Sequence, residues 1–214
     1  QTDDRLTLLS AGPTGFTASS SMTEYAFASY FGRMNYSLDS KYFLDLSVRN
    51  DQSSRFGRNL RSANFYSVGA MWRAKNEKFI QSIKWINDLT VKGSIGTSGN
   101  SSIGNYQSLA TVGTNLYNAT PGWGIGSAGN PELSWETQRQ INVGVQATLF
   151  NRLNLDVEYF DRLTSSMLIS VPYPYTTGFS SITSNVGSLR NAGFNANINY
   201  DFIKKKSSNL NVYA

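Results

Sequence analysis

The sequence predicts an all-β fold in which antiparallel strands cross a membrane as part of a β-barrel, and three observations favour it. Polar and apolar residues alternate along segments of about ten residues or more, which is longer than most strands of soluble sheets. The connections between these segments are alternately short and long, as is typical of transmembrane barrels. Aromatic residues gather where strands meet the short connections, as they do in the girdles at lipid headgroups.

The segment 44–51 has the clearest alternation, because its two faces differ completely in polarity. One face carries Leu44, Leu46 and Val48, and the other carries Asp45, Ser47, Arg49 and Asp51. We interpret the first face as lipid-facing and the second as the lining of a wet lumen. Similar apolar faces without a charge are expected at 26–36, 66–72, 89–95, 141–149, 153–159 and 194–202. Together with a last strand from about residue 210, they make about eight strands of a larger barrel.

The connections divide into two sets. Short turns are expected at 39–40, 151–152 and 204–208, where the residue types suit hairpins. The segment 75–88 is a longer exception on that side, and its Phe79, Ile83 and Trp85 could pack as a short cap. Long outer loops are expected at about 52–64, 98–136 and 162–184. Loops of this length usually carry function. Aromatic residues at the turn ends of the strands are Tyr36, Tyr42, Trp72, Phe150 and Phe202.

The composition excludes several kinds of chemistry. The 214 residues include no His and no Cys, which excludes His-based triads, His or Cys zinc sites, thiol catalysis and disulfides. The net charge is +5, but the basic residues are scattered, so no nucleic-acid surface is expected. No stretch approaches the roughly 18 apolar residues of a membrane-spanning helix. We expect no enzyme activity, no cofactor and no metal site.

Five charged residues are candidates for the lumen or for substrate contact: Arg33, Asp45, Arg49, Asp51 and Arg55. Arg33 and Arg49 could line a pathway, and Arg55 could meet an anionic or hydroxyl-rich substrate at the rim, because guanidinium groups form oriented hydrogen bonds. Alternatively, the arginines pair with carboxylates in a crowded lumen. We favour this pairing, since nothing in the spacing singles out a ligand.

The longest loop and a later strand add further candidates. Tyr106, Tyr117 and Trp123 could stack on sugar rings, although packing within the loop explains them equally well. Asp156 and Glu158 share a strand face about 7 Å apart. That spacing is compatible with a pair of catalytic carboxylates, but polar residues wetted by a lumen are the simpler interpretation.

Several segments together resemble a known family. SYFGRMNYSLDSKYFLDLSVRNDQSSRFG at 29–57 combines a Tyr-Phe-Gly-Arg strand, a hairpin and a Ser-Ser-Arg-Phe-Gly loop. The later segments are SVGAMWR at 67–73, KWINDLTVKGSIGTSGN at 84–100, IGNYQ at 103–107, NPELSWETQRQINVG at 130–144, NRLNLDVEYFDRLTSSML at 151–168, PYPYTTGF at 172–179 and NVGSLRNAGF at 185–194. Over about 24–203, their order and spacing resemble the barrel of SusC/RagA-type TonB-linked outer-membrane transporters.

The resemblance implies a 22-stranded barrel with a plugged lumen, in the outer membrane of a Gram-negative bacterium. It implies energy supply through TonB, and a SusD-like surface lipoprotein that helps to capture oligosaccharides or peptides. The plug and the closing strand are not recognisable, so we expect residues 1–214 to be an internal part of one barrel domain, with the TonB contact elsewhere. Two alternatives remain open: a soluble β-sandwich adhesion or binding module, and a small outer-membrane enzyme with catalytic residues at its rim.

Overall fold

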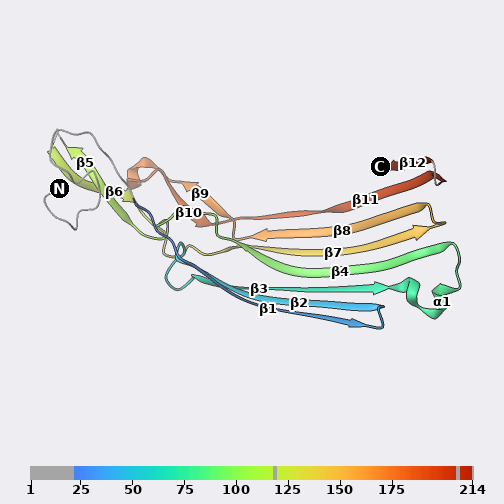
Figure 1. Ribbon diagram of the computed structural model, residues 1–214. Helices are drawn as coiled ribbons and strands as arrows, with labels where there is room; N and C mark the ends of the chain where they lie inside the picture. Colours follow the sequence, from blue (N-terminus) through green and yellow to red (C-terminus); the bar gives the residue numbers. More distant parts are fainter. Residues whose placement is uncertain (1–21, 118–119, 206–207, 214) are drawn as a thin grey trace.

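The computed structural model describes residues 22–117, 120–205 and 208–213 (Figure 1). Their strands are β1 (Phe27–Leu38), β2 (Tyr42–Ser53), β3 (Ser62–Arg73), β4 (Ile86–Asn100), β5 (Thr111–Tyr117), β6 (Thr120–Ser127), β7 (Glu136–Leu149), β8 (Leu153–Ser165), β9 (Leu168–Pro172), β10 (Ser181–Asn185), β11 (Ser188–Lys205) and β12 (Ser208–Tyr213). Their helical segments are η2 (Ala74–Asn76), α1 (Lys78–Gln81) and η3 (Tyr175–Thr177).

Eight of the strands form one antiparallel sheet, in the order β1-β2-β3-β4-β7-β8-β11-β12. This confirms the prediction of about eight long antiparallel strands. Two separate hairpins, β5–β6 and β9–β10, were not predicted. They fill most of the long connections at 101–135 and 166–187, and Figure 1 shows them at the end of the sheet opposite α1 and the short turns.

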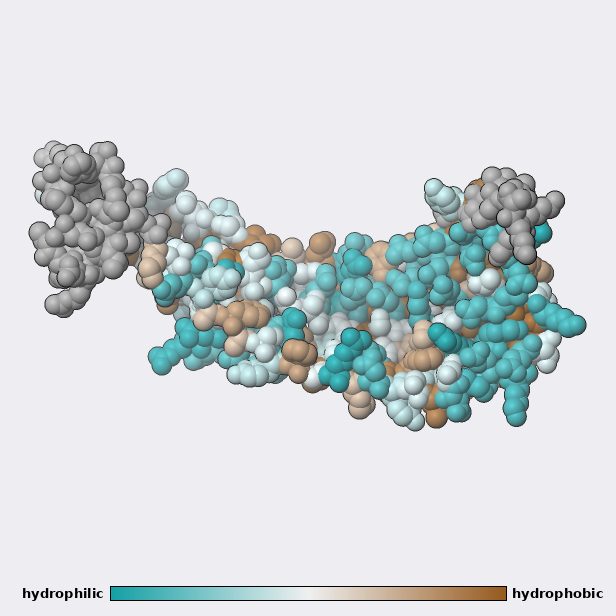
Figure 2. All heavy atoms as spheres, viewed as in Figure 1, coloured by the Kyte–Doolittle hydropathy of each residue, from teal (hydrophilic) through white to brown (hydrophobic). Residues whose placement is uncertain are grey.

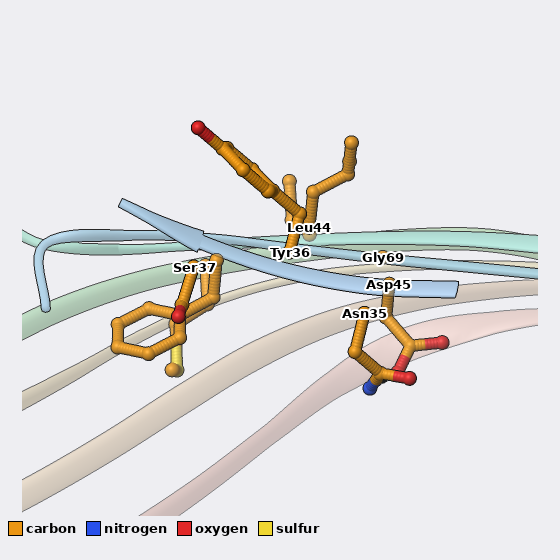
Figure 3. A pocket seen from close by; sticks show the side chains of 10 residues that line it. Asn35, Tyr36, Ser37, Leu44, Asp45 and Gly69 are labelled. Atoms are coloured by element: carbon orange, nitrogen blue, oxygen red, sulfur yellow. Dashed lines mark hydrogen bonds between the residues drawn. The ribbon is translucent and has the colours of Figure 1, made fainter. Parts of the chain in front are cut away.

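The sheet has two chemically different faces because every pairing preserves the alternation. In Figure 3, Asn35 and Asp45 point to one side of the sheet, and Tyr36 and Leu44 point to the other. The polar face consists of the odd-numbered residues of β1, β2, β3 and β11 and the even-numbered residues of β4, β7 and β8. The opposite parity forms the apolar face, in which Val91, Val145 and Val157 are cross-strand neighbours.

The apolar face carries no second layer within the described residues (Figure 1). Val143, Val145, Val157 and Ile198 are exposed on it. A soluble sandwich would bury these side chains against another sheet, so the β-sandwich alternative does not hold. The exposed band instead suits contact with lipid.

The short turns follow the expected chemistry in one case and differ in another. Asp39 and Ser40 both have φ near 52°, and Lys41 N donates to Leu38 O, as in a type I′ hairpin. The β7–β8 turn is centred on Phe150 and Asn151, whose φ values are 54° and 55°, and not on residues 151–152 as predicted. Phe150 adopts this unusual conformation while its ring stacks on Trp85 at 5.8 Å.

Exposed aromatic residues lie at the turn end of the sheet, as the sequence predicts. Tyr36, Tyr42 and Phe150 are exposed there. The cap at 74–81 differs from the prediction, because Ile80 is its buried residue and Phe79 points to solvent. Figure 2 shows hydrophilic residues gathered at this end, over α1.

Glu77 ties this cap to the first hairpin. Its carboxylate accepts a hydrogen bond from Tyr42 Oη at 2.7 Å, and Lys41 Nζ donates to its other oxygen at 3.2 Å. These two contacts, with the Tyr42 hydrogen bond as the larger cause, hold the pKa of Glu77 below its ordinary value of 4.5.

Replacing Tyr42 by Phe is therefore expected to raise the pKa of Glu77 toward 4.5. Because the pKa is lower in the folded chain than in the unfolded chain, the contact stabilises the fold above about pH 4.5 and loses its effect as the pH falls through the folded pKa. The carboxyl ¹³C shift of Glu77 measures this, with Glu77→Gln assigning the signal. An unchanged titration midpoint in Tyr42→Phe would contradict the role of the hydrogen bond.

Candidate functional site

The first arginine–aspartate pair lies on the polar face where β1 meets β2. Arg33 donates to Asp45 Oδ2 from Nε at 3.2 Å and from Nη2 at 2.5 Å, and Asn35 Nδ2 donates to the same oxygen at 2.7 Å. The Arg33 side chain is 64% exposed, so solvent screens the pair and its net stabilisation is at most about 1 kcal/mol. The pair mainly fixes the direction of a guanidinium that still has free N–H groups.

The second pair lies further toward the long loops on the same face. Arg49 Nη2 is 2.6 Å from Asp51 Oδ2, and Ser29 Oγ donates to Asp51 Oδ1. The Asp51 side chain is only 1% exposed, whereas that of Arg49 is 50% exposed. A carboxylate buried this deeply needs a charged partner, so Arg49 is held in place while one side of its guanidinium stays accessible.

These pairs border one groove of about 660 Å³, lined on the polar face by Ser29, Arg33, Asp45, Ser47, Arg49 and Ser67. The groove contains two oriented guanidinium groups and three hydroxyls. Such a surface donates hydrogen bonds to carboxylate, carbonyl or hydroxyl oxygens. The structure thus brings four predicted residues, Arg33, Asp45, Arg49 and Asp51, into one neighbourhood.

Arg55 lies apart from this groove, in the connection between β2 and β3. Its Nε donates to Asn105 Oδ1 at 2.9 Å, its Nη1 donates to Ser101 O at 3.3 Å, and its guanidinium lies 4.1 Å from the ring centre of Tyr25. These contacts join the β2–β3 connection to the segment after β4.

The three predicted aromatic residues of the longest loop occupy different places. Tyr106 Oη accepts a hydrogen bond from Glu24 N at 2.8 Å, beside the group that holds Arg55. Trp123 lies on β6 and is 80% exposed. Tyr117 ends β5, but its side chain lies outside the described residues.

Asp156 and Glu158 do not form a free carboxylate pair. Lys92 Nζ lies 3.2 Å from Asp156 Oδ1 and 3.8 Å from Glu158 Oε2, across from β4. A lysine placed between two carboxylates neutralises part of their repulsion. The polar face therefore carries a third ion-paired group, whose lysine the sequence analysis did not single out.

A loop core at the outer end of the sheet was not predicted. Phe56, Phe65, Leu133 and Trp135 form one buried cluster. The Trp135 ring lies 4.9 Å from Phe56 and 5.7 Å from Phe65, and its Nε1 donates to Arg61 O at 2.9 Å. The cluster fixes the β2–β3 connection against the residues that precede β7.

A further side chain ties the third loop to the same place. Ser134 N donates to Asn185 Oδ1 at 2.7 Å, and Asn185 Nδ2 donates back to Ser134 O at 2.8 Å and to Ser166 O at 3.0 Å. The rim above the polar groove is therefore built from three loops whose bases are joined.

Gly57 is expected to be essential for this joint. Gly57 N donates to Leu133 O at 2.9 Å, and a Cβ at Gly57 would lie 1.8 Å from Pro131 O. Gly57→Ala should therefore separate the two loops at a cost of about 1–3 kcal/mol, measured as faster trypsin cleavage after Arg58 in the full-length protein. Gly113→Ala is the matched control, because no atom lies within 4 Å of its added Cβ; equal cleavage in both variants would contradict the prediction.

Two searches of the described residues bear on the class of site. No helix among them has the length and apolar character needed to cross a membrane. They also contain no group of three or more acidic residues placed to hold a metal ion.

The single sheet, with one lipid-compatible face and one polar face, defines a segment of a transmembrane β-barrel. Residues 2–214 match the family model described as TonB dependent receptor-like, beta-barrel, and the chain belongs to this family. In such a barrel the polar face lines the lumen and the apolar face meets lipid, with the long loops outside the cell.

Individual relatives agree with this assignment. The chain is 36% identical over 184 residues to TonB-dependent receptor P39 of Formosa agariphila, covering 85% of this chain and 18% of that protein. It is 33% identical over 188 residues to TonB-dependent receptor SusC of Bacteroides thetaiotaomicron, covering 83% and 19%. The structure of the RagAB peptide importer in its closed-closed state is 47% identical, with a TM-score of 0.85 over 99% of this chain and 24% of that one. The chain thus spans about a fifth of the length of the curated relatives it matches.

Proposed function

We propose that the chain forms part of the wall of a TonB-dependent nutrient importer in the outer membrane of a Gram-negative bacterium. The observation that carries the proposal is the polar groove at Arg33 and Arg49, which lies opposite an apolar face without charges at the same level. A wall that is wet on one side and lipid-facing on the other suits a transport path. The names of the relatives, which include SusC and a peptide importer, support oligosaccharides or peptides as the substrate class.

The proposal assigns different roles to the candidate residues. Arg33 and Arg49, held by Asp45 and Asp51, present hydrogen-bond donors to the lumen. Arg55 and Tyr106 hold the bases of the outer loops together and border the entrance. Trp123 is the exposed aromatic contact for a sugar or peptide, and Tyr117 is proposed for the same role.

The proposed importer works with partners outside this segment. A SusD-like lipoprotein would sit over the outer loops, and a plug elsewhere in the protein would contact TonB. The relatives named SusC and RagAB support such a two-component assembly.

Uptake measurements test the proposal. Cells lacking the native protein are complemented with the full-length protein and given labelled oligosaccharides or labelled peptides, with and without TonB. Restored, TonB-dependent uptake of either class is the expected result, and uptake that persists without TonB, or no uptake of either class, would overturn it.

Arg33→Gln is expected to reduce this uptake severalfold, because the groove loses one of its two guanidinium groups while Asn35 still satisfies Asp45. Arg152→Gln is the matched control, since Arg152 follows the short turn at the opposite end of the sheet. Equal uptake by both variants, at equal amounts of protein in the membrane, would contradict the role of Arg33.

A further inference from the structure

Three charged residues interrupt the apolar face, and they lie together. Across β1, β2, β3, β4, β7, β8 and residues 188–200 of β11, the charges on this face are Arg139, Asp161 and Arg190. Arg139 and Arg190 both lie opposite Leu163, one on each neighbouring strand, and Asp161 is the next residue of β8 on the same face.

The contacts within this group leave one positive charge over. Arg190 donates to both oxygens of Asp161, from Nε at 3.1 Å and from Nη2 at 2.7 Å, as a bidentate pair. Among the described residues Arg139 forms no hydrogen bond, and its interaction with Asp161 is electrostatic only. The group therefore carries two arginines against one carboxylate, and the guanidinium of Arg139 is available.

The depth of the group matches the outer surface of the bilayer. From Leu153 at the turn end to Asp161, β8 rises about 27 Å at ~3.4 Å per residue, or about 21 Å after allowing for a strand tilt of ~40°. The residues just below it on the same face, Tyr159 and Phe194, form an aromatic pair with ring centres 5.1 Å apart. An apolar band of about 25 Å ends at such aromatic residues, so the group lies at the level of the outer-leaflet headgroups.

We propose that Arg139, with Arg190 beside it, binds the phosphate group of an outer-leaflet lipid headgroup. The acyl chains of that lipid would lie along the apolar face directly below, so the phosphate site continues a surface that already meets lipid. A planar guanidinium suits a phosphate better than an ammonium does, because it forms two parallel hydrogen bonds. Asp161 holds Arg190 in position without neutralising Arg139. This inference rests on the proposed outer-membrane location.

Native mass spectrometry of the full-length protein in detergent tests the proposal. The probes are lipid A with two phosphates, the same lipid A without phosphates, and inorganic phosphate as a competitor. We expect the wild type to retain the phosphorylated form at least fivefold more than the dephosphorylated form, and Arg139→Gln to reduce retention by about tenfold, as expected for loss of a charge-assisted bond. Arg152→Gln, which removes the same charge at the periplasmic turn, should retain the lipid as the wild type does.

Three results would overturn the proposal. Equal retention by Arg139→Gln and the wild type would mean that Arg139 only reaches toward water. Full displacement of the lipid by millimolar inorganic phosphate would indicate a simple anion site. A wild type that does not discriminate between the two lipid A forms would exclude phosphate recognition, and normal substrate uptake by the same protein would leave the importer proposal standing.

Discussion

Replacing Trp135 by alanine is expected to release the rim loops and to raise trypsin cleavage after Arg58 on the order of a hundredfold or more. Trp135 is buried and contacts the rings of Phe27, Phe56 and Phe65. Truncating a buried tryptophan typically costs about 3–5 kcal/mol. The barrel strands below keep their backbone hydrogen bonds, so the loss should appear as local opening of the loops.

Two variants make the Trp135 experiment specific. Trp135→Phe keeps a ring in the cluster but loses the hydrogen bond from Nε1 to Arg61 O, so an increase in cleavage of about fivefold is expected. Trp123→Ala removes the same type of side chain from the exposed face of β6 and should leave cleavage after Arg58 unchanged. If Trp135→Ala and Trp123→Ala behaved alike, Trp135 would not be the centre of a loop core.

The sheet could be predicted from the sequence because its determinants are local. Alternation in 44–51 fixes which side chains share a face, whatever strand lies beside them. The same logic extends to Arg139, Asp161 and Arg190, since each continues the parity of a predicted apolar face by one or two steps. The predicted faces ended at residues 141, 159 and 194, and extending them would have found the charged group.

The rim could not be predicted in the same way. Phe56 and Trp135 meet across a long sequence separation, and loop residues follow no period that indicates which of them will pack. The partners of Arg55 are equally non-local, because Asn105 and Tyr25 come from two other segments. The turn at Phe150 was misplaced by one residue because a positive φ at Phe is rare, and its stacking partner Trp85 lies outside the hairpin.

Inserting an arginine in the middle of the apolar face should have the second large effect. Val145 lies between Val91 and Val157, midway along the apolar part of β7. In the bilayer, Val145→Arg would place a charge near the centre of the hydrocarbon, at a cost of about 2–4 kcal/mol. Urea unfolding of the full-length protein in lipid vesicles measures this loss as a lower transition midpoint at an unchanged slope.

The adjacent residue supplies a control that differs in the face alone. Gln146 lies on the polar face opposite Thr90 and Asp156, so an arginine there would reach water in the lumen and a nearby carboxylate. Gln146→Arg is therefore expected to change the free energy of unfolding by less than about 1 kcal/mol. Equal losses at positions 145 and 146 would mean that the two faces meet similar surroundings, and both the lipid contact and the wet lumen would have to be abandoned together. A loss confined to Val145→Arg would support a wall with lipid on one side and water on the other, which the proposed importer requires.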